Sequence, residues 1–379
     1  FILSEIPEAL TLSTALPVKL GLRISETPWV ALEGRANALA TSSVTVNGIP
    51  AVWSAWKARW TADAVALQPG LNHLSVRAFD ASHAELDHLE FTVWHETGAH
   101  QSVNANITTD TVLSAADGPW FFPGKTIVQK KAALSIEAGT MVYFGEGAQL
   151  EVRGRLTISG DPDRQATLTT PPGTSHRWNG IRWIDSTQPN RLAHVNISSV
   201  ASDTAAVQAE SSRLELSNVA FRDLLGTAIE FSNSALVTSA CSFEASTIEA
   251  GTAVPIVTGS GLAGDDHVVF RGNHFHATDR AAPVFVFDGQ GQLGAWLELR
   301  GNRFWGGPRE AVELSGCNSF LWENRFQNFR HPESPAKRTA TVSISGTSAG
   351  ARTSAVLARN HLGQADVAVR LVGRGSLEA

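Results

Sequence analysis

Apolar and polar residues alternate with a period of two along most of this chain, and the three-to-four-residue period of an amphipathic helix is almost absent. Gly, Asn, Asp and Ser break the alternating segments at short intervals. Alternation over short runs bounded by such residues is typical of β-strands that bury one face. The pattern therefore predicts an all-β protein.

The alternating segments between residues 17 and 97 are short and closely spaced. Asn47-Gly48 follows one of them and is a strong signal for a β-hairpin, and residues 71–80 alternate without a break. Several short strands at such spacing are typical of a small β-sandwich. We expect a sandwich over 17–97, with a linker or the end of another domain over 1–16 and a connecting segment over 98–124.

From residue 125 onward, short apolar strands end at nearly regular glycines, and an internal repeat becomes explicit after residue 200. A fixed period made only of strands and turns predicts a solenoid, because one unit is too small to bury its own apolar face. The repeated units start at Ala206-Val207, Ala228-Ile229, Pro255-Ile256, Val284-Phe285, Ala311-Val312, Thr341-Val342 and Ala368-Val369.

The later units also share the motif Asn-x-Phe. It occurs at Asn273–Phe275, Asn302–Phe304 and Asn324–Phe326. Because stacked units place like residues above like residues, the asparagines should form a ladder of side-chain amides at one corner. The phenylalanines, two positions later, should form an aromatic column inside the solenoid.

Two parts of the chain resemble known families. The stretch from Val44 to Asp80, with Val46-Asn47-Gly48, Trp60 and Gln68-Pro69-Gly70, resembles bacterial immunoglobulin-like domains. Residues 134–144, Trp178-Asn179-Gly180-Ile181 and the Asn-x-Phe units resemble right-handed parallel β-helix proteins.

The order of these elements is similar to the C-terminal region of large secreted multidomain bacterial proteins, which often also carry lamin-tail-like and spore-coat-kinase-like domains. This resemblance covers residues 20–379. It implies an all-β fold with a small immunoglobulin-like β-sandwich, followed by a right-handed parallel β-helix over 125–379 whose C-terminal coil is incomplete. It implies a secreted or cell-surface location, and it carries no enzymatic activity over to this chain.

Composition and charge exclude some classes of binding partner. Lys and Arg number 30 against 36 Asp and Glu, a net charge of −6, which argues against nucleic acid. No apolar window is long enough to span a membrane. Cys241 and Cys317 lie three repeats apart, about 14 Å at strand spacing, whereas a disulfide needs Cα atoms within about 7 Å. We expect both thiols to be free. The chain starts at Phe1 without a methionine and ends in mid-coil, so we expect it to be a piece of something longer.

Carboxylates are the first candidates for chemistry, because β-helix folds include polysaccharide lyases and hydrolases. Hydrolases need two carboxyl groups flanking one bond. Asp265-Asp266 is the only adjacent Asp pair, and a solvated loop is its alternative interpretation. Asp288 is a further candidate at a turn between units. We expect no cofactor, and Ca²⁺ is the one ion that acidic side chains of this kind would suit.

Tryptophans and histidines are the other candidates. Trp296, Trp305 and Trp322 fall in successive units, and a column of them could stack on sugar rings; packing under loops is the alternative. Trp305, beside Gly306-Gly307, is the best candidate for exposure. His274 and His276 flank Phe275, so both should point away from the core, where they could hold a metal ion or simply face solvent.

The sequence thus supports two functional hypotheses. The first is a non-catalytic, extracellular structural or adhesive module, rigid, elongated and able to self-associate through its β-helix ends. The alternative is a β-helix protein that binds or degrades polysaccharide. Three carboxylates converging in a cleft near Trp305, Asp288 and Asp265 would favour the alternative.

Overall fold

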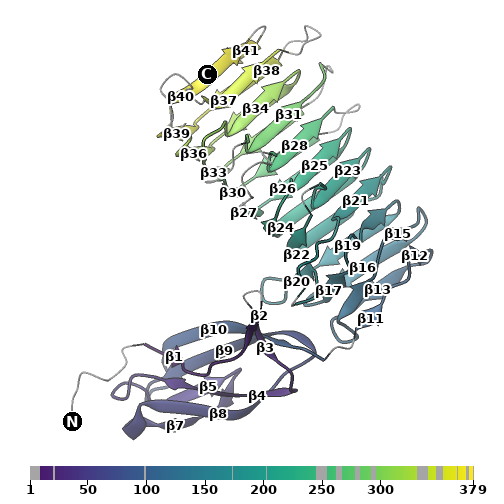
Figure 1. Cartoon of the computed structure of the whole chain (residues 1–379). Coiled ribbons are helices and arrows are strands. Elements are labelled where there is room, and N and C mark those ends of the chain that lie inside the picture. The colour runs from purple at the N-terminus through teal and green to yellow at the C-terminus, as the bar shows by residue number, and fades with distance from the viewer. Residues whose placement is uncertain are drawn as a thin grey trace. The chain divides into compact units, whose positions relative to one another are not determined.

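The structure of the chain, a computed structural model, divides into two compact units, 1–100 and 101–379 (Figure 1). In the described part, every regular element is a strand except one short 3₁₀ helix, η2 (Ala55–Lys57), so no helix there could cross a membrane. The described residues are 9–19, 22–97, 100–172, 174–201, 203–244, 254–261, 267–277, 282–291, 296–330, 340–346, 353–364, 366–372 and 375–378.

The first unit packs two sheets on one core. The first sheet has the order β1 (Thr11–Leu12), β4 (Trp29–Arg35), β8 (Arg59–Ala66) and β7 (Val52–Ser54). The second has the order β2 (Val18–Lys19), β3 (Leu22–Ser25), β10 (Glu85–His95), β9 (Gly70–Phe79), β5 (Ser43–Val46) and β6 (Ile49–Pro50). Both sheets contribute to one apolar core. This is a sandwich; its membership of the immunoglobulin-like family stays a prediction.

The turn between β5 and β6 explains how one hairpin forms. Asn47 (φ 50°) and Gly48 (φ 77°) both adopt the left-handed conformation, which a two-residue turn between twisted antiparallel strands requires. The hairpin predicted at Asn47-Gly48 is confirmed by the pairing of Val46 with Ile49.

The second unit is a solenoid of two long sheets in which all pairings are parallel (Figure 1). One sheet stacks β12 (Asn106–Ile107), β15 (Thr126–Val128), β18 (Leu150–Val152), β21 (Ile181–Ile184), β23 (Val207–Glu210), β25 (Ile229–Ser232), β28 (Val257–Ser260), β31 (Phe285–Asp288), β34 (Val312–Ser315), β37 (Ala340–Ser345) and β40 (Val367–Val372).

The other sheet supplies two strands to most coils. It contains β11 (Gln101–Ser102), β13 (Thr111–Leu113), β14 (Trp120–Phe122), β16 (Ala133–Glu137), β17 (Met141–Phe144), β19 (Arg155–Ser159), β20 (Ala166–Thr169), β22 (Asn190–Val200), β24 (Arg213–Leu224), β26 (Ala235–Ser239), β27 (Ser242–Glu244), β29 (His267–Arg271), β30 (His274–His276), β32 (Trp296–Arg300), β33 (Arg303–Trp305), β35 (Asn318–Trp322), β36 (Arg325–Gln327), β38 (Thr353–Ala358), β39 (His361–Gly363) and β41 (Gly375–Glu378).

These stacked parallel sheets confirm the predicted fold class, an all-β chain with a parallel β-helix. The boundaries differ in two places. Within 1–16, expected to be a linker or the end of another domain, β1 pairs with β4 and Leu10 joins the core of the sandwich. Within 98–124, expected to be a connecting segment, residues from Gln101 onward belong to the solenoid and form β11 to β14. These strands are only two or three residues long, too short for alternation to reveal, although Leu113 and Phe122 already bury their side chains in the common core.

The register of the repeat is as predicted except in one unit. Val207 and Ile229 lie at equivalent positions on two neighbouring coils, and so do Phe285, Val312 and Val342 on three later ones. Between Ile229 and Phe285 the equivalent residue is Val257, whereas the sequence suggested Ile256. The carbonyl of Ile256 accepts hydrogen bonds from the N–H groups of both Ala228 and Ile229, so the strand is shifted by one residue there.

The amide ladder predicted at the Asn-x-Phe corner is confirmed. Asn273, Asn302 and Asn324 each donate from Nδ2 to the Oδ1 of the next asparagine, over 3.0 Å at every step, and the series ends at Asn360. The Oδ1 atoms of Asn302, Asn324 and Asn360 also accept the backbone N–H of the preceding coil's Asn. Burying an amide group costs free energy unless the group is hydrogen-bonded. In this stack, the amide donors of one coil are hydrogen-bonded by the side-chain oxygen of the next coil's asparagine.

The aromatic column is confirmed too. Phe221, Phe243, Phe275, Phe304 and Phe326 stack with ring centroids 4.5 to 4.9 Å apart and interplanar angles of 17° or less. Strand spacing of about 4.8 Å sets this distance.

The two cysteines are free, as predicted, and both are buried. Burial raises the pKa of Cys241 to about 11 and the pKa of Cys317 to about 12.

Candidate binding face

One outward face of the solenoid brings several sequence-predicted residues together. It is formed by β30, β33, β36 and β39, which stack along one side (Figure 1). Their sequences are HFH, RFW, RFQ and HLG, and the central residue of each points inward. We call the outward residues of these strands the cationic face: His274, His276, Arg303, Trp305, Arg325, Gln327 and His361.

One column of the cationic face carries only nitrogen bases. His274, Arg303, Arg325 and His361 occupy equivalent positions on four successive strands, and all are exposed. Neighbouring strands lie about 4.8 Å apart. The four strands contain no Asp or Glu, so no carboxylate of this face neutralises the two guanidinium groups.

The second column carries the exposed aromatic ring. Trp305 lies between His276 and Gln327 and is 45% exposed. It leaves the core because alternation along β33 sends Phe304 inward. With the Gln327 amide turned so that its oxygen faces Arg325, that oxygen accepts from the Arg325 guanidinium at 3.0 Å, which links the two columns. The prediction that Trp305 is exposed is borne out.

The other two candidate tryptophans lie on adjacent strands of the same sheet and differ from each other. Trp296, at the start of β32, is 50% exposed. Trp322, at the end of β35, is half-buried: the Arg359 guanidinium lies over its ring at 5.2 Å. Its indole N–H is buried without a hydrogen-bond partner among the described residues. The Trp322 ring therefore packs against Arg359, while Trp296 and Trp305 face outward.

The acidic candidates do not join this face. Asp288 ends β31, in the 11-stranded sheet, whereas Trp305 lies in the 20-stranded sheet. Its Oδ1 accepts the N–H of Gln290, so the carboxylate stabilises its own turn. Asp265 and Asp266 lie outside the described residues. The described residues thus do not bring three carboxylates together near Trp305, the arrangement that would favour a polysaccharide-degrading protein.

His274 and His276 are both exposed on either side of buried Phe275, as the alternation predicted. In the part of the chain that the structure describes, no three His, Cys, Asp or Glu side chains gather closely enough to hold a metal ion. The two histidines therefore have no third metal ligand in that part of the chain. The same part contains no cluster of three carboxylates that could bind Ca²⁺.

A carboxyl pair that sequence reasoning missed lies beside β34. Glu310 has a side chain only 10% exposed, with Oε1 3.6 Å from the Arg370 guanidinium and Oε2 3.6 Å from Arg309. Burial, and next the charge of Glu310, raise the pKa of Glu313. The sequence around Glu310 does not reveal this environment, because Arg370 comes from β40, two coils further on.

Glu313→Gln should raise the melting temperature at pH 7. The folded state raises the pKa of Glu313 above its unfolded value, so the ionised carboxylate is disfavoured on folding at neutral pH. Below the unfolded pKa both states are protonated and the difference disappears. Thermal melts at pH 7 and pH 4 check this, with Glu230→Gln, an exposed glutamate three coils earlier in the same column, as the matched control. Equal gains at both pH values, or in the control, would contradict it.

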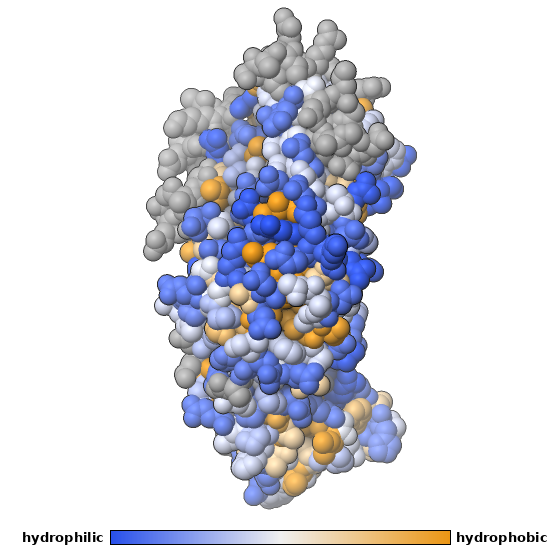
Figure 2. All heavy atoms as spheres, turned by 90° about the vertical axis from the view of Figure 1, so that its right-hand side faces the viewer, coloured by the Kyte–Doolittle hydropathy of each residue, from blue (hydrophilic) through white to orange (hydrophobic). Residues whose placement is uncertain are grey.

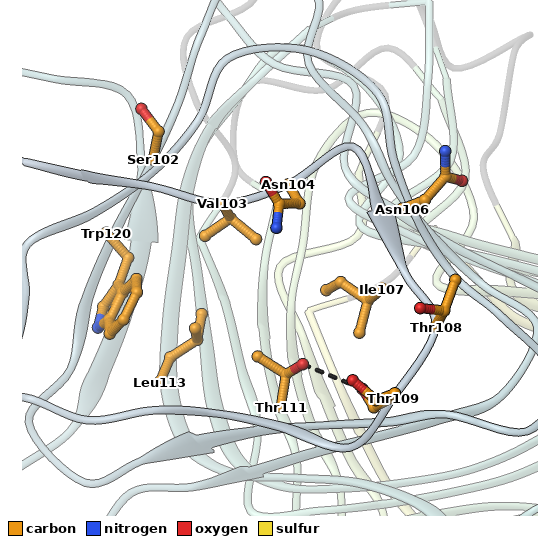
Figure 3. Close-up of a pocket in the computed structure, with 10 residues that line it drawn as sticks. All are labelled: Ser102, Val103, Asn104, Asn106, Ile107, Thr108, Thr109, Thr111, Leu113 and Trp120. Atoms are coloured by element: carbon orange, nitrogen blue, oxygen red, sulfur yellow. Dashed lines mark hydrogen bonds between the residues drawn. The ribbon is translucent and has the colours of Figure 1, made fainter.

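Two surface hollows lie on the solenoid. The first coil has a pocket of about 210 Å³ lined mostly by hydroxyl and amide side chains, where Thr111 donates to the Thr109 carbonyl (Figure 3). A shallow hollow of about 290 Å³ lies over β21, β23 and β25, where Arg182 bonds Glu210 at 3.2 Å. Figure 2 shows one side of the molecule as mostly hydrophilic, with small separate apolar patches. The lining of the first pocket contains no charged side chain.

No protein-family model matches this chain, and no curated protein matches its sequence. Among solved structures, the family 28 exopolygalacturonase of Yersinia enterocolitica is 9% identical, with 98% of this chain and 99% of that chain covered and a TM-score of 0.26. The A-module of the Azotobacter vinelandii mannuronan C-5 epimerase AlgE4 is 12% identical, with 74% and 91% covered and a TM-score of 0.24.

The Streptococcus pneumoniae surface protein and adhesin PfbA is 10% identical to this chain, with 72% and 91% covered and a TM-score of 0.21. At these scores the similarities identify no residue role here. The fold class rests on the strand pairing of the chain itself, and the site rests on the side chains of the cationic face.

Proposed function

We propose that this protein is an extracellular polysaccharide-binding module and that the cationic face of its solenoid is the binding surface. The observation that carries the proposal is Trp305, a large aromatic side chain held outward on a rigid strand between polar neighbours. Exposed aromatic rings among hydrogen-bonding groups are typical of recognition surfaces. An indole face can pack against the C–H face of a sugar ring, while flanking Arg and His groups donate to its oxygens.

The proposal is binding, not hydrolysis. Glycosidic hydrolysis needs two carboxyl groups on either side of the bond. The carboxyl pair beside β34 does not meet this need, because Glu310 is 10% exposed and lies between two arginines. A structural or adhesive role is compatible with glycan binding, and self-association through the solenoid ends stays a prediction.

Trp305→Ala should weaken binding of a soluble polysaccharide at least about tenfold, since loss of a central aromatic contact removes about 2 kcal/mol and about 1.4 kcal/mol is a factor of ten. Affinity gel electrophoresis over a panel of neutral and charged polysaccharides measures it. Trp29→Ala is the matched control, because Trp29 is 55% exposed on β4 of the other unit. A wild-type chain that binds no member of the panel, or a Trp305→Ala chain that binds as well as wild type, would refute the proposal.

A further inference from the structure

We infer that the cationic face selects anionic polysaccharides, whose sugar units carry carboxylate or sulfate groups. The inference deepens the proposed function and rests on it. Its basis is the column His274, Arg303, Arg325 and His361, on strands that carry no acidic residue, in a chain whose net charge is −6.

Three exposed arginines on earlier coils of the same sheet are paired with carboxylates of the next coil. Nε of Arg191 lies 3.7 Å from Glu215, Nε of Arg222 lies 3.7 Å from Glu244, and Nε of Arg271 lies 3.3 Å from Glu298. Arg191 and Glu215 occupy equivalent positions on neighbouring strands, whereas Glu298 lies two residues before Arg300, the residue opposite Arg271. An arginine on one coil paired with a glutamate on the next coil is thus a repeated feature of this surface.

Arg303 and Arg325 depart from that pattern. Each occupies a position whose neighbours in the column are basic, and neither has a carboxylate partner among the described residues. Like charges directly opposite each other on neighbouring strands are destabilising. A ligand that supplies the missing negative charge would remove this repulsion, and guanidinium groups bind carboxylate and sulfate through paired N–H donors.

The backbone fixes the spacing of the two guanidinium groups. Arg303 and Arg325 each lie directly between a ladder asparagine and a stacked phenylalanine, so the residues that hold the coils in register also hold the column. Successive anionic groups of a polymer would meet cations at a repeat of about 4.8 Å. On β33, Trp305 lies two residues beyond Arg303, about 6.6 Å along the strand, so a ring platform and an anion clamp share one strand.

The test uses the full chain and one polymer backbone in three forms: dextran, carboxymethyl-dextran and dextran sulfate, with oligo-dT as a polyanion that is not a glycan. We expect wild type to bind one or both anionic forms at least tenfold more tightly than dextran, and to lose most of that preference in 0.5 M NaCl. The two anionic forms distinguish carboxylate from sulfate. Arg303→Gln/Arg325→Gln should reduce anionic binding at least tenfold and weaken dextran binding by a clearly smaller factor, because glutamine still donates hydrogen bonds to neutral sugar oxygens but carries no charge.

Arg191→Gln/Arg222→Gln is the matched control, because it removes the same charge from paired arginines on earlier coils and should change binding less than threefold. Arg303→Lys/Arg325→Lys keeps the charge and should retain part of the binding. Dextran bound as tightly as the anionic forms would overturn the inference and leave the proposed function standing. No glycan bound would overturn both. Oligo-dT bound as tightly as the anionic dextrans, or equal losses in the matched control, would also overturn the inference.

Discussion

Asn302→Ala should destabilise the solenoid by roughly 3 kcal/mol. Asn302 is fully buried and makes four hydrogen bonds: its Oδ1 accepts the N–H and Nδ2 of Asn273, and its Nδ2 donates to Asn324 and to the Phe270 carbonyl. Alanine leaves the two Asn273 donors without an acceptor, and each unpaired buried donor costs about 1–3 kcal/mol. Denaturant unfolding followed by circular dichroism measures the loss.

Two companion variants separate the ladder from general damage. Asn302→Asp keeps the acceptor but loses both donated bonds and buries a charge, so its loss at pH 7 should exceed that of alanine. Asn318→Ala, on a half-buried position of β35, should change stability by less than about 0.5 kcal/mol. If the three variants unfold at the same denaturant concentration as wild type, the ladder does not stabilise the fold.

Phe275→Ala should have the second large effect, a loss of about 3–5 kcal/mol. Its ring is 1% exposed and lies between Phe243, at 4.5 Å and 3°, and Phe304, at 4.6 Å and 7°. Alanine would open a cavity between two coils that rigid parallel strands cannot close. The same unfolding experiment measures the loss, and the denaturant slope reports whether the coils still unfold together.

Phe275→Leu is the control for this prediction. Leucine keeps most of the apolar volume and loses the ring stacking, so a loss of about 1 kcal/mol is expected. A leucine variant as unstable as the alanine variant would mean that ring stacking, and not filled volume, dominates the column. An alanine variant within 1 kcal/mol of wild type would show that the core relaxes around the gap.

The features predictable from sequence were those encoded by nearby residues. Asn47-Gly48 fixes its own turn, and each Asn-x-Phe unit places an amide and a ring two residues apart, so repetition alone produces a ladder and a column. The strands of 101–124 were missed because two or three residues carry no periodicity. The one-residue shift at Val257 depends on how Ile256 bonds the neighbouring coil, which the repeat spacing does not contain.

The candidate site was predictable only in part, because it depends on contacts between distant coils. Alternation correctly sends Trp305 outward, yet it also sends Trp322 outward, and the contact that covers this ring, Arg359, comes from the next coil. The pair of Glu310 with Arg370 spans 60 residues of sequence. The acid-free column of Arg303 and Arg325 was visible in the sequence, but its meaning depends on the Arg–Glu pairing of the other coils.

The amide ladder also determines where this chain can be shortened. Backbone N–H groups of Cys241, Asn273, Asn302 and Asn324 are satisfied by a side chain that comes 22 to 36 residues later. A coil with complete strands is therefore still unfinished at its corner until the following Asn is present. Truncations placed at strand ends alone would leave buried donors open, whereas those that retain the next Asn would close the corner. The unit of assembly is thus one coil plus the first corner of its successor.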